Sequence, residues 1–435
     1  HNTIIENDIS NNEFGIGIYS SNNNSIIENR ITYNSRDAIW LEGSSSNNIA
    51  GNDITNSGGI SLTWGSSNNS LFGNNITNNR GGIYLQMSSD NIFRSNIMDN
   101  NMRNFAVSGD IPLAYLNDVD PSNTVNGKPV YYWINKRDAA VPPNAGYVAL
   151  INCTNITIKN LNLTNNMDAV LLAYTADSTI AQNNATSIYL WQSSNNTISG
   201  NSIANKKYIN SMEWLGSGIQ LEYSSNNSMF GNDIGNHWIG IDLDRSSRNR
   251  ISGNSITAND YGISLYDFSI YNIISGNIIA NNEYGVNLGE FSNNNTICHN
   301  SFMSNTQQFS SERSINTWDD GYPSGGNYWS DYEDRYPDAK ELDDSCIWNT
   351  PYVIDSNNVD HYPLMEPSIP LFGDLNNDEK VDILDIVATA NAFASYPGHP
   401  RWNPIADVNK DDIVNIIDIV LIAKNFGKTG TQQAI

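Results

Sequence analysis

One recurring phrase constrains the fold of this chain more than any other feature. It reads "NTIIENDIS" from Asn2 to Ser10 and returns as "NSIIENRIT" from Asn24 to Thr32. Each copy carries an asparagine at the same place, and the usual step between copies is about 22 to 23 residues, as in solenoid repeats. The marked asparagines are Asn7, Asn29, Asn52, Asn74, Asn201, Asn232, Asn254, Asn277 and Asn300.

Each repeat unit also contains a second phrase in which Gly or Ala is followed by aliphatic-x-Leu. Examples are "DAIWLEG", "SGIQLEY" and "IGIDLDR". This alternation has the period of two of a strand with one buried face. Runs of Ser and Asn between the phrases supply turns, because Asn tolerates left-handed backbone angles. The units have no room for a helix, so we expect an all-β, right-handed parallel β-helix with one coil per repeat.

Stacked coils would place the marked asparagines in a column. At the usual strand spacing of about 4.8 Å, each side-chain amide can bond its neighbours and the turn backbone. Each such bond contributes about 0.5 to 1.5 kcal/mol. We therefore interpret these asparagines as structural.

Composition narrows the range of partners. The chain has 22 Lys and Arg against 46 Asp and Glu, which gives a formal net charge of -24. Nucleic acid and anionic membrane surfaces are disfavoured, because binding to phosphates depends on Lys and Arg. Calcium is favoured. No apolar run reaches the roughly 18 to 20 residues of a transmembrane helix.

The phrases divide the chain into segments. We expect N-terminal coils over 1–104, an irregular break over 105–151, C-terminal coils over 152–309, an aromatic and Asp-rich cap over 310–367, a linker over 368–372, a calcium module over 373–428 and a tail over 429–435. The chain begins inside a repeat, so we interpret His1 as the start of a mature or trimmed product. We expect an extracellular or cell-surface location.

The strongest chemical motifs are "DLNNDEKVDILD" and "DVNKDDIVNIID". Each twelve-residue loop offers oxygen ligands at positions one, three, five, seven, nine and twelve, as calcium requires. The predicted ligands are Asp374, Asn376, Asp378, Lys380, Asp382, Asp385, Asp407, Asn409, Asp411, Ile413, Asn415 and Asp418, with Lys380 and Ile413 acting through their carbonyls. Position six is Glu379 and Asp412, where such loops normally have Gly.

A stripe of aromatic and acidic residues follows the outward positions of the second phrase. Aromatic faces stack on sugar rings and carboxylates accept sugar hydroxyls, so the stripe could bind a glycan. The alternative is a solvated sheet face. The candidates are Trp40, Glu42, Trp64, Tyr84, Tyr189, Trp191, Glu222, Tyr223, Asp242, Asp244, Tyr266 and Asp267.

Catalysis is the least favoured reading of this stripe. Asp242, Asp244 and Asp267 could pair as acid and base in a hydrolase. The segments that mark β-helix pectinases are missing, and the only positive group that we assign to the stripe is Arg245. If the protein were an enzyme, it would be a polysaccharide hydrolase or lyase.

Sequons for N-glycosylation occur along the coils. They suit an exterior glycoprotein, and chance in an Asn- and Ser-rich chain explains them equally well. The candidate acceptors are Asn23, Asn68, Asn75, Asn155, Asn162, Asn184, Asn195, Asn226 and Asn294.

Two resemblances follow from these motifs. The coils, with "NTVNGKPVYYWIN" and "GGNYWSDYEDRYPD", resemble the β-helix repeats of carbohydrate-binding and sugar-hydrolase solenoids and of the NosD-like family, in forms common in archaea. The calcium module resembles a dockerin, which implies a cohesin-like partner. Our leading hypothesis is a surface or filament-forming protein that assembles through this module, with itself head to tail or with that partner. The alternative is a carbohydrate-binding or polysaccharide-degrading protein recruited by the module.

Overall fold

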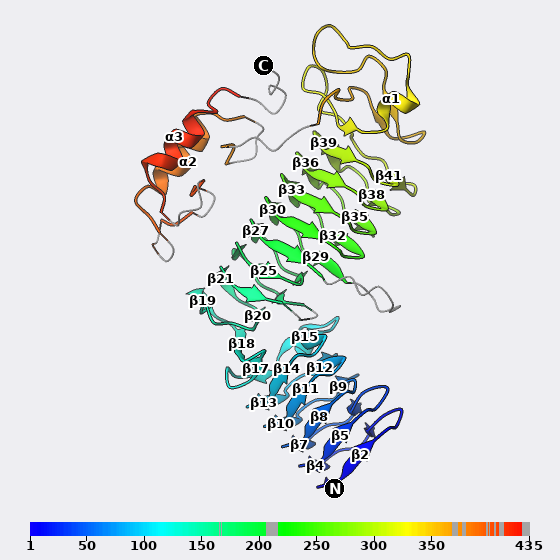
Figure 1. The fold of residues 1–435 in the computed structure, drawn as a ribbon, viewed down its shortest axis with the longest axis vertical. Coiled ribbons are helices and arrows are strands. Elements are labelled where there is room, and N and C mark those ends of the chain that lie inside the picture. The colour runs from blue at the N-terminus through cyan, green and yellow to red at the C-terminus, as the bar shows by residue number, and fades with distance from the viewer. Residues whose placement is uncertain are drawn as a thin grey trace. The chain divides into compact units, whose positions relative to one another are not determined.

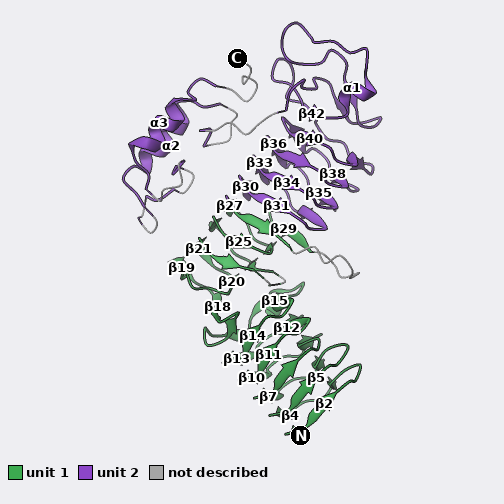
Figure 2. Cartoon of the chain, in the orientation of Figure 1, with its two compact units in different colours: residues 1–197, 201–225 green, residues 198–200, 226–435 purple. Residues whose placement is uncertain are grey.

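The structure of the protein is a computed structural model that describes residues 1–164, 166, 168–205, 216–367, 373–375, 380–396, 399, 401–403, 406–408 and 413–428. The chain forms two compact units, one of residues 1–197 and 201–225 and the other of residues 198–200 and 226–435 (Figure 2). Short strands stacked in successive coils make up most of each unit (Figure 1).

The first unit begins with a stack of coils that has three sheets. The first sheet holds β1 (Thr3–Ile5), β4 (Ser25–Ile27), β7 (Asn48–Ala50), β10 (Ser70–Phe72), β13 (Ile92–Arg94) and β16 (Asp118–Val119). The second holds β2 (Asp8–Ser10), β5 (Arg30–Thr32), β8 (Asp53–Thr55), β11 (Asn75–Thr77), β14 (Ile97–Asp99) and β17 (Thr124–Val125). The third, here called sheet C, holds β3 (Ile16–Tyr19), β6 (Ile39–Glu42), β9 (Ile60–Thr63), β12 (Gly81–Gln86) and β15 (Arg103–Ser108).

A second stack completes this unit. One sheet holds β18 (Lys128–Ile134), β20 (Tyr147–Ile151), β23 (Val170–Ala173), β26 (Ile188–Trp191) and β29 (Ser217–Glu222). The others hold β19 (Arg137–Ala140), β21 (Thr154–Lys159), β24 (Thr179–Ala181) and β27 (Thr197–Ser199), and β22 (Asn162–Leu163), β25 (Asn184–Ala185) and β28 (Ser202–Ala204). A 3-10 turn, η1 (Pro112–Tyr115), precedes β16.

The second unit repeats the same coil architecture. Its three sheets hold β30 (Ser228–Phe230), β33 (Arg250–Ser252), β36 (Ile273–Ser275) and β39 (Thr296–Cys298); β31 (Asp233–Gly235), β34 (Ser255–Thr257), β37 (Ile278–Ala280), β40 (Ser301–Met303) and β42 (Tyr328–Trp329); and β32 (Ile239–Asp244), β35 (Tyr261–Tyr266), β38 (Tyr284–Leu288) and β41 (Gln307–Ser311). Strands of successive coils pair in parallel, as in β32–β35 and β35–β38. The predicted parallel β-helix is thus confirmed.

Buried asparagines join the coils, also as predicted. In the second unit Asn254 Nδ2 donates to Asn277 Oδ1 and Asn277 Nδ2 donates to Asn300 Oδ1, both at 2.9 Å. Asn277 Nδ2 also donates to the Ile251 carbonyl at 2.9 Å, and Asn277 Oδ1 accepts the Asn254 backbone N–H at 2.9 Å. These contacts use all the hydrogen-bonding groups of the amide. The regular spacing of the asparagines along the chain therefore has a structural explanation.

The ladders are more extensive than the phrase suggested. The marked column continues through Asn96, Asn123 and Asn327. Further ladders follow other corners, such as Asn227–Asn249–Asn272–Asn295 and Asn259–Asn282–Asn305. Inside the coils, Ile and Leu columns are fully buried, and each such side chain contributes about 1.5 to 3 kcal/mol.

The glycine of the second phrase lets the backbones of neighbouring coils approach closely. A Cβ on Gly240 would lie 2.5 Å from the Gly262 carbonyl oxygen, and one on Gly262 would lie 2.4 Å from that of Gly285. Because both contacts are with backbone, only glycine fits these positions in closely stacked coils.

The break in the coil stack is shorter than the predicted 105–151 segment. β15, β16 and β17 still pair with the preceding coil, and the stack turns only at Asn126 and Gly127, whose φ angles are 50° and 72°. This hairpin pairs β17 antiparallel to β18, and β18 begins the second stack. The predicted boundaries at 104 and 152 are therefore wrong. The η1 segment lengthens the ladder steps Asn91–Asn117 and Asn96–Asn123 to 26 and 27 residues, which hides the phrase.

Aromatic rings cover the last coil of the second unit. Trp329 stacks on Phe302 at 4.4 Å between ring centroids and on Tyr352 at 4.2 Å. This cap also contains α1 (Tyr332–Arg335), β43 (Tyr352–Val353) and β44 (Val359–Asp360). The rings remove the apolar end of the coil from water.

Asp360 ends the main asparagine ladder inside this cap. Its Oδ2 accepts the Asn327 backbone N–H at 2.8 Å and Trp329 Nε1–H at 2.9 Å, while its Oδ1 accepts the Tyr362 N–H at 3.2 Å. Burial raises the pKa of Asp360 to about 7 despite these bonds, and the nearby Asp319 adds to the rise.

Two short helices form the C-terminal module, α2 (Ile383–Asn391) and α3 (Ile416–Ala423). Each begins with a capping box, Asp382 with Asp385 and Asn415 with Asp418. The module is therefore a structural duplication, as the two sequence motifs predict.

Removing one rung of the ladder should destabilise the coils. We expect Asn277→Ala to lower the free energy of unfolding by about 3 kcal/mol, because it removes the acceptor of the Asn254 N–H and the donor to the Ile251 and Ser275 carbonyls. Asn184→Ala, at an exposed strand position, is the control and should change little. Chemical denaturation followed by tryptophan fluorescence measures both; equal losses would contradict a special role for the ladder.

Asp360 should make the cap less stable as the pH rises. Its pKa is about 7 when folded against 3.8 for the ordinary group. Folding therefore favours the protonated acid, and this contribution is complete below about pH 4 and lost as the pH rises through about 7. We expect the Tm of the native protein to fall relative to that of Asp360→Asn between about pH 5 and pH 8. A constant difference between the two Tm values would refute the assignment.

Candidate functional site

A groove of about 760 Å³ lies on the outer face of sheet C in the first unit. Its floor follows one register column, in which Trp40, Ser61, Tyr84 and Ala106 stand on successive strands. These positions alternate with buried Ile and Leu, so the strand geometry itself directs them outward.

Three arginines line the groove: Arg36, Arg80 and Arg103. Among the described residues that line the groove, Asp37 is the only one with a carboxyl group. Arg36 Nε lies 3.2 Å from Glu13 Oε1, and its guanidinium lies 5.4 Å from the centre of the Phe14 ring. Three guanidinium groups thus gather on one face of a chain whose formal net charge is -24.

Asp37 lies among these arginines. Ser61 Oγ donates a hydrogen bond to Asp37 Oδ1 at 3.0 Å. Burial raises the pKa of Asp37, while the Ser61 bond, Arg80 and Arg36 work in the opposite direction. The carboxyl is thus held in a partly dehydrated position.

Two aromatic side chains of the predicted stripe belong to the groove. Trp40 stacks on Phe14 at 5.6 Å, and its Nε1 donates to Thr63 Oγ1 at 3.2 Å. Tyr84 OH lies 3.0 Å from Ser108 Oγ, and burial raises its pKa. Their polar atoms are therefore fixed by neighbouring coils.

The candidate residues predicted from the sequence did not include the three arginines or Asp37. A signal was nevertheless present, since Arg36, Arg80 and Arg103 are 44 and 23 residues apart, which is two steps and then one step of the repeat. Aligning the repeats on their corner residues, as well as on the aliphatic-x-Leu phrase, would have found them.

Two other candidates of the stripe are buried in the first unit, and Glu222 lies beside them, partly exposed. Trp191 is 1% exposed and packs against Tyr115 and Tyr174 at 4.9 and 4.8 Å. Tyr189 is also buried, and its hydroxyl donates to Glu222 Oε2 at 2.7 Å. The prediction that Trp191 points outward and binds a glycan was wrong, because Tyr115 of the η1 segment packs over this part of the sheet face.

Asp168 adds an ionisable group beside this interior cluster. Burial raises its pKa to about 6, and Arg103 opposes the rise. The same carboxyl raises the pKa of Tyr84 and Tyr147. Nothing in the sequence pattern marked Asp168, because it lies outside both repeated phrases.

The acidic candidates lie on the outer face of β32 and β35 in the second unit. Asp242 and Asp244 pair in register with Ser264 and Tyr266. Arg245 lies between Asp244, at 3.5 Å, and Asp267, with which it forms an ion pair. Burial raises the pKa of Asp244. Trp64 and Tyr223 are exposed residues that follow β9 and β29, and neither lines the groove.

Coil geometry explains most of the sequons. Asn23, Asn68, Asn155, Asn195, Asn226 and Asn294 occupy left-handed corners with φ between 55° and 60°. In five of them a buried ladder asparagine follows, and a strand begins with the Ser or Thr after it. Asn75, Asn162 and Asn184 are exposed strand residues.

The predicted calcium loops are described in part. Leu375 N donates to Asp385 Oδ1 at 2.7 Å, and Val408 N donates to Asp418 Oδ1 at 2.9 Å. These bonds bring Asp374 and Asp407, at the start of each loop, close to the carboxylate at its end. Asp382 and Asn415 cap the helices, and Lys380 and Ile413 precede them. Asn376, Asp378, Asn409 and Asp411 lie outside the described residues.

Comparison with known proteins supports the fold class. Residues 1–119 match the family described as a right-handed β-helix region, and residues 208–334 match the family described as periplasmic copper-binding protein (NosD). With the coils described above, these matches define a right-handed parallel β-helix repeat protein. No curated protein matches the sequence.

Several solved structures align with much of the chain at low similarity. The A-module of a mannuronan C-5 epimerase from Azotobacter vinelandii is 12% identical with a TM-score of 0.31, over 72% of this chain and 90% of that one. A periplasmic alginate epimerase is 14% identical with a TM-score of 0.28, over 71% and 75%. An alginate lyase from Paenibacillus is 10% identical with a TM-score of 0.22, over 72% and 99%. Scores this low carry no argument about activity.

Proposed function

We propose that the protein binds an acidic polysaccharide along the groove of sheet C. The observation that carries this proposal is the group of three arginines, Arg36, Arg80 and Arg103, on one face of a strongly acidic chain. Guanidinium groups bind carboxylates through paired, charge-assisted hydrogen bonds. A polymer with repeated carboxylates matches arginines that recur with the coils.

The remaining groove residues suit a sugar backbone. Trp40 and Tyr84 offer aromatic surface, and Ser61 and Thr63 offer hydroxyls on the same face. Asp37, with its raised pKa, can accept or donate a hydrogen bond to a sugar hydroxyl. Binding rather than turnover is proposed. We also propose that the protein is located outside the cell. No helix in the described part of the chain is long and apolar enough to cross a membrane.

Replacing a groove arginine should weaken binding of acidic polymers. We expect Arg80→Gln to raise the Kd for polygalacturonate by about tenfold or more, from the loss of a charged hydrogen bond. Isothermal titration at two salt concentrations measures this effect. Arg30→Gln is the matched control, because Arg30 is exposed and pairs with Asp8 outside the groove. Equal binding of polygalacturonate and a neutral galactan would exclude the proposal.

We also propose that the C-terminal module binds two calcium ions. Asp385 and Asp418 are fully buried, and each accepts two backbone N–H groups. Each carboxylate thus stands at the closing point of a loop that carries further oxygen ligands, which fits a hard cation. Calcium would supply the charge that holds each acidic loop together.

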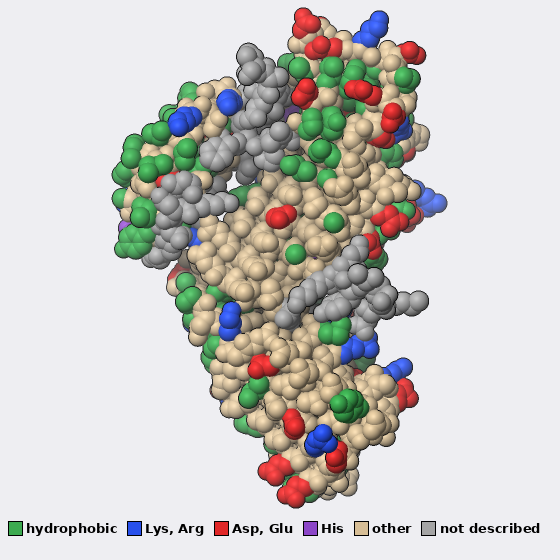
Figure 3. Space-filling model, viewed as in Figure 1, with side chains coloured by type: hydrophobic (Ala, Val, Ile, Leu, Met, Phe, Trp, Pro, Cys, Tyr) green, Lys and Arg blue, Asp and Glu red, His purple; other side chains and the backbone are tan. Residues whose placement is uncertain are grey.

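The same module presents an apolar face. Ile383, Leu384 and Val387 of α2 and Ile416, Ile417 and Val420 of α3 are all at least 44% exposed. Green apolar side chains gather over these helices in Figure 3. Such a face favours a docking role, and we propose a cohesin-like protein as its partner. Head-to-tail assembly with a second copy is the competing hypothesis.

Calcium binding can be counted directly. We expect titration calorimetry to detect two ions on the native protein and one on Asp385→Asn, since that substitution removes a charged ligand from one loop only. Asp343→Asn, in the cap, should still bind two. Binding of no calcium by the native protein would refute the assignment.

A further inference from the structure

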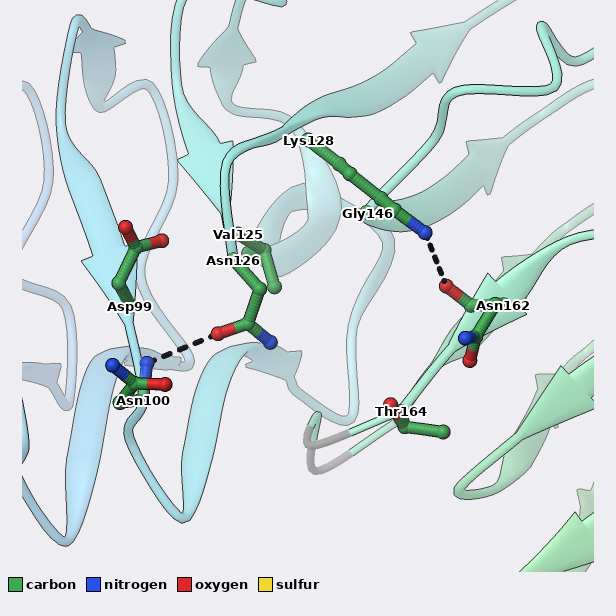
Figure 4. A pocket seen from close by; sticks show the side chains of 8 residues that line it. All are labelled: Asp99, Asn100, Val125, Asn126, Lys128, Gly146, Asn162 and Thr164. Atoms are coloured by element: carbon green, nitrogen blue, oxygen red, sulfur yellow. Dashed lines mark hydrogen bonds between the residues drawn. The ribbon is translucent and has the colours of Figure 1, made fainter.

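A second, polar pocket of about 440 Å³ lies where the coil stack of the first unit is interrupted (Figure 4). On one side are Asp99 and Asn100, at the end of β14, and Asn126 in the hairpin. On the other side are Asn162 and Thr164, at β22. Because the hairpin reverses the chain, β22 begins a new sheet instead of continuing the sheet of β14.

The pocket side chains Asn100, Asn126 and Asn162 are exposed and, unlike the buried asparagines of the ladders, are open to a ligand from solvent. Asn126 Oδ1 accepts the Asn100 N–H at 3.0 Å, while its Nδ2 has no hydrogen bond within the described chain. The side chains of Asn100, Asn162 and Thr164 likewise have no hydrogen bond to any described residue. Several donors and acceptors therefore face one concave space.

The charged groups of the pocket balance each other. Lys128 Nζ donates to the Asn162 carbonyl at 3.3 Å, which holds the ammonium above the pocket (Figure 4). Asp99 Oδ1 accepts the Gly127 N–H at 3.0 Å from the opposite side. One cation and one anion give no net charge, in contrast to the arginine-rich groove.

We propose that this pocket is a binding site for a neutral sugar ring. Hydroxyl groups both donate and accept, so they match a lining of amides, a hydroxyl, an ammonium and a carboxylate. The volume lies within the range of small-molecule sites, about 300 to 1,000 Å³. Val125 and Gly146 provide the apolar part of the lining. The ligand is either a free monosaccharide or the end of a neutral oligosaccharide.

Titration with defined sugars tests the site. The full chain is titrated with glucose, galactose, mannose, a neutral galactose disaccharide and glucuronate. We expect saturable binding of at least one neutral sugar, which Lys128→Met and Asn162→Ala each weaken by about fivefold or more. Asn184→Ala is the matched control, because Asn184 pairs in register with Asn162 on the next coil and does not line the pocket. Tighter binding of the disaccharide identifies a chain end, and equal binding identifies a monosaccharide site.

Other results would overturn the inference. These are no saturable binding of a neutral sugar, binding of glucuronate alone, or binding that Lys128→Met and Asn162→Ala leave unchanged. Arg80→Gln separates this site from the groove, because it should leave neutral-sugar binding intact. Failure of the groove proposal would therefore be visible independently, in the polygalacturonate titration.

Discussion

The asparagine ladder is the interaction on which the rest of the structure depends. A parallel coil stack must satisfy the backbone of its corners as well as its strands, and a buried amide does this with one side chain per corner and coil. Asn277, for example, serves the coil before it, its own corner and the coil after it. Since unpaired polar groups in the interior are costly, the ladder fixes both the spacing of the coils and the register of their outer faces.

That fixed register gives the protein its sites. Equivalent residues of successive coils lie above one another, so a residue type repeated at the right step becomes a continuous surface. In sheet C this produces a groove with arginines on one side and aromatic rings on its floor. On β32 and β35 the same geometry produces an acidic face. The two units thus present chemically different surfaces, although they share one architecture.

Departures from the repeat create the remaining features. Extra residues around η1 cover Tyr189 and Trp191, and the Asn126–Gly127 hairpin leaves a polar pocket beside β22. In the cap of the second unit, Asp360 replaces the next ladder asparagine and accepts the bonds that a further coil would have taken. Because burial raises the pKa of Asp360, the stability of the cap depends on pH.

The sequence by itself determined the coil architecture, the ladder asparagines and the duplicated loops of the C-terminal module. It could do so because these features are local and periodic: Asn, Gly and the Ile/Leu columns recur at the step of one coil. Only the tertiary structure decided which outward residues reach solvent. Trp40 and Tyr189 occupy the same place in the phrase, directly before its Leu, yet one lines a groove and the other is buried beneath a distant segment. Solvent exposure depends on packing between non-repeating segments, and no periodic pattern records it.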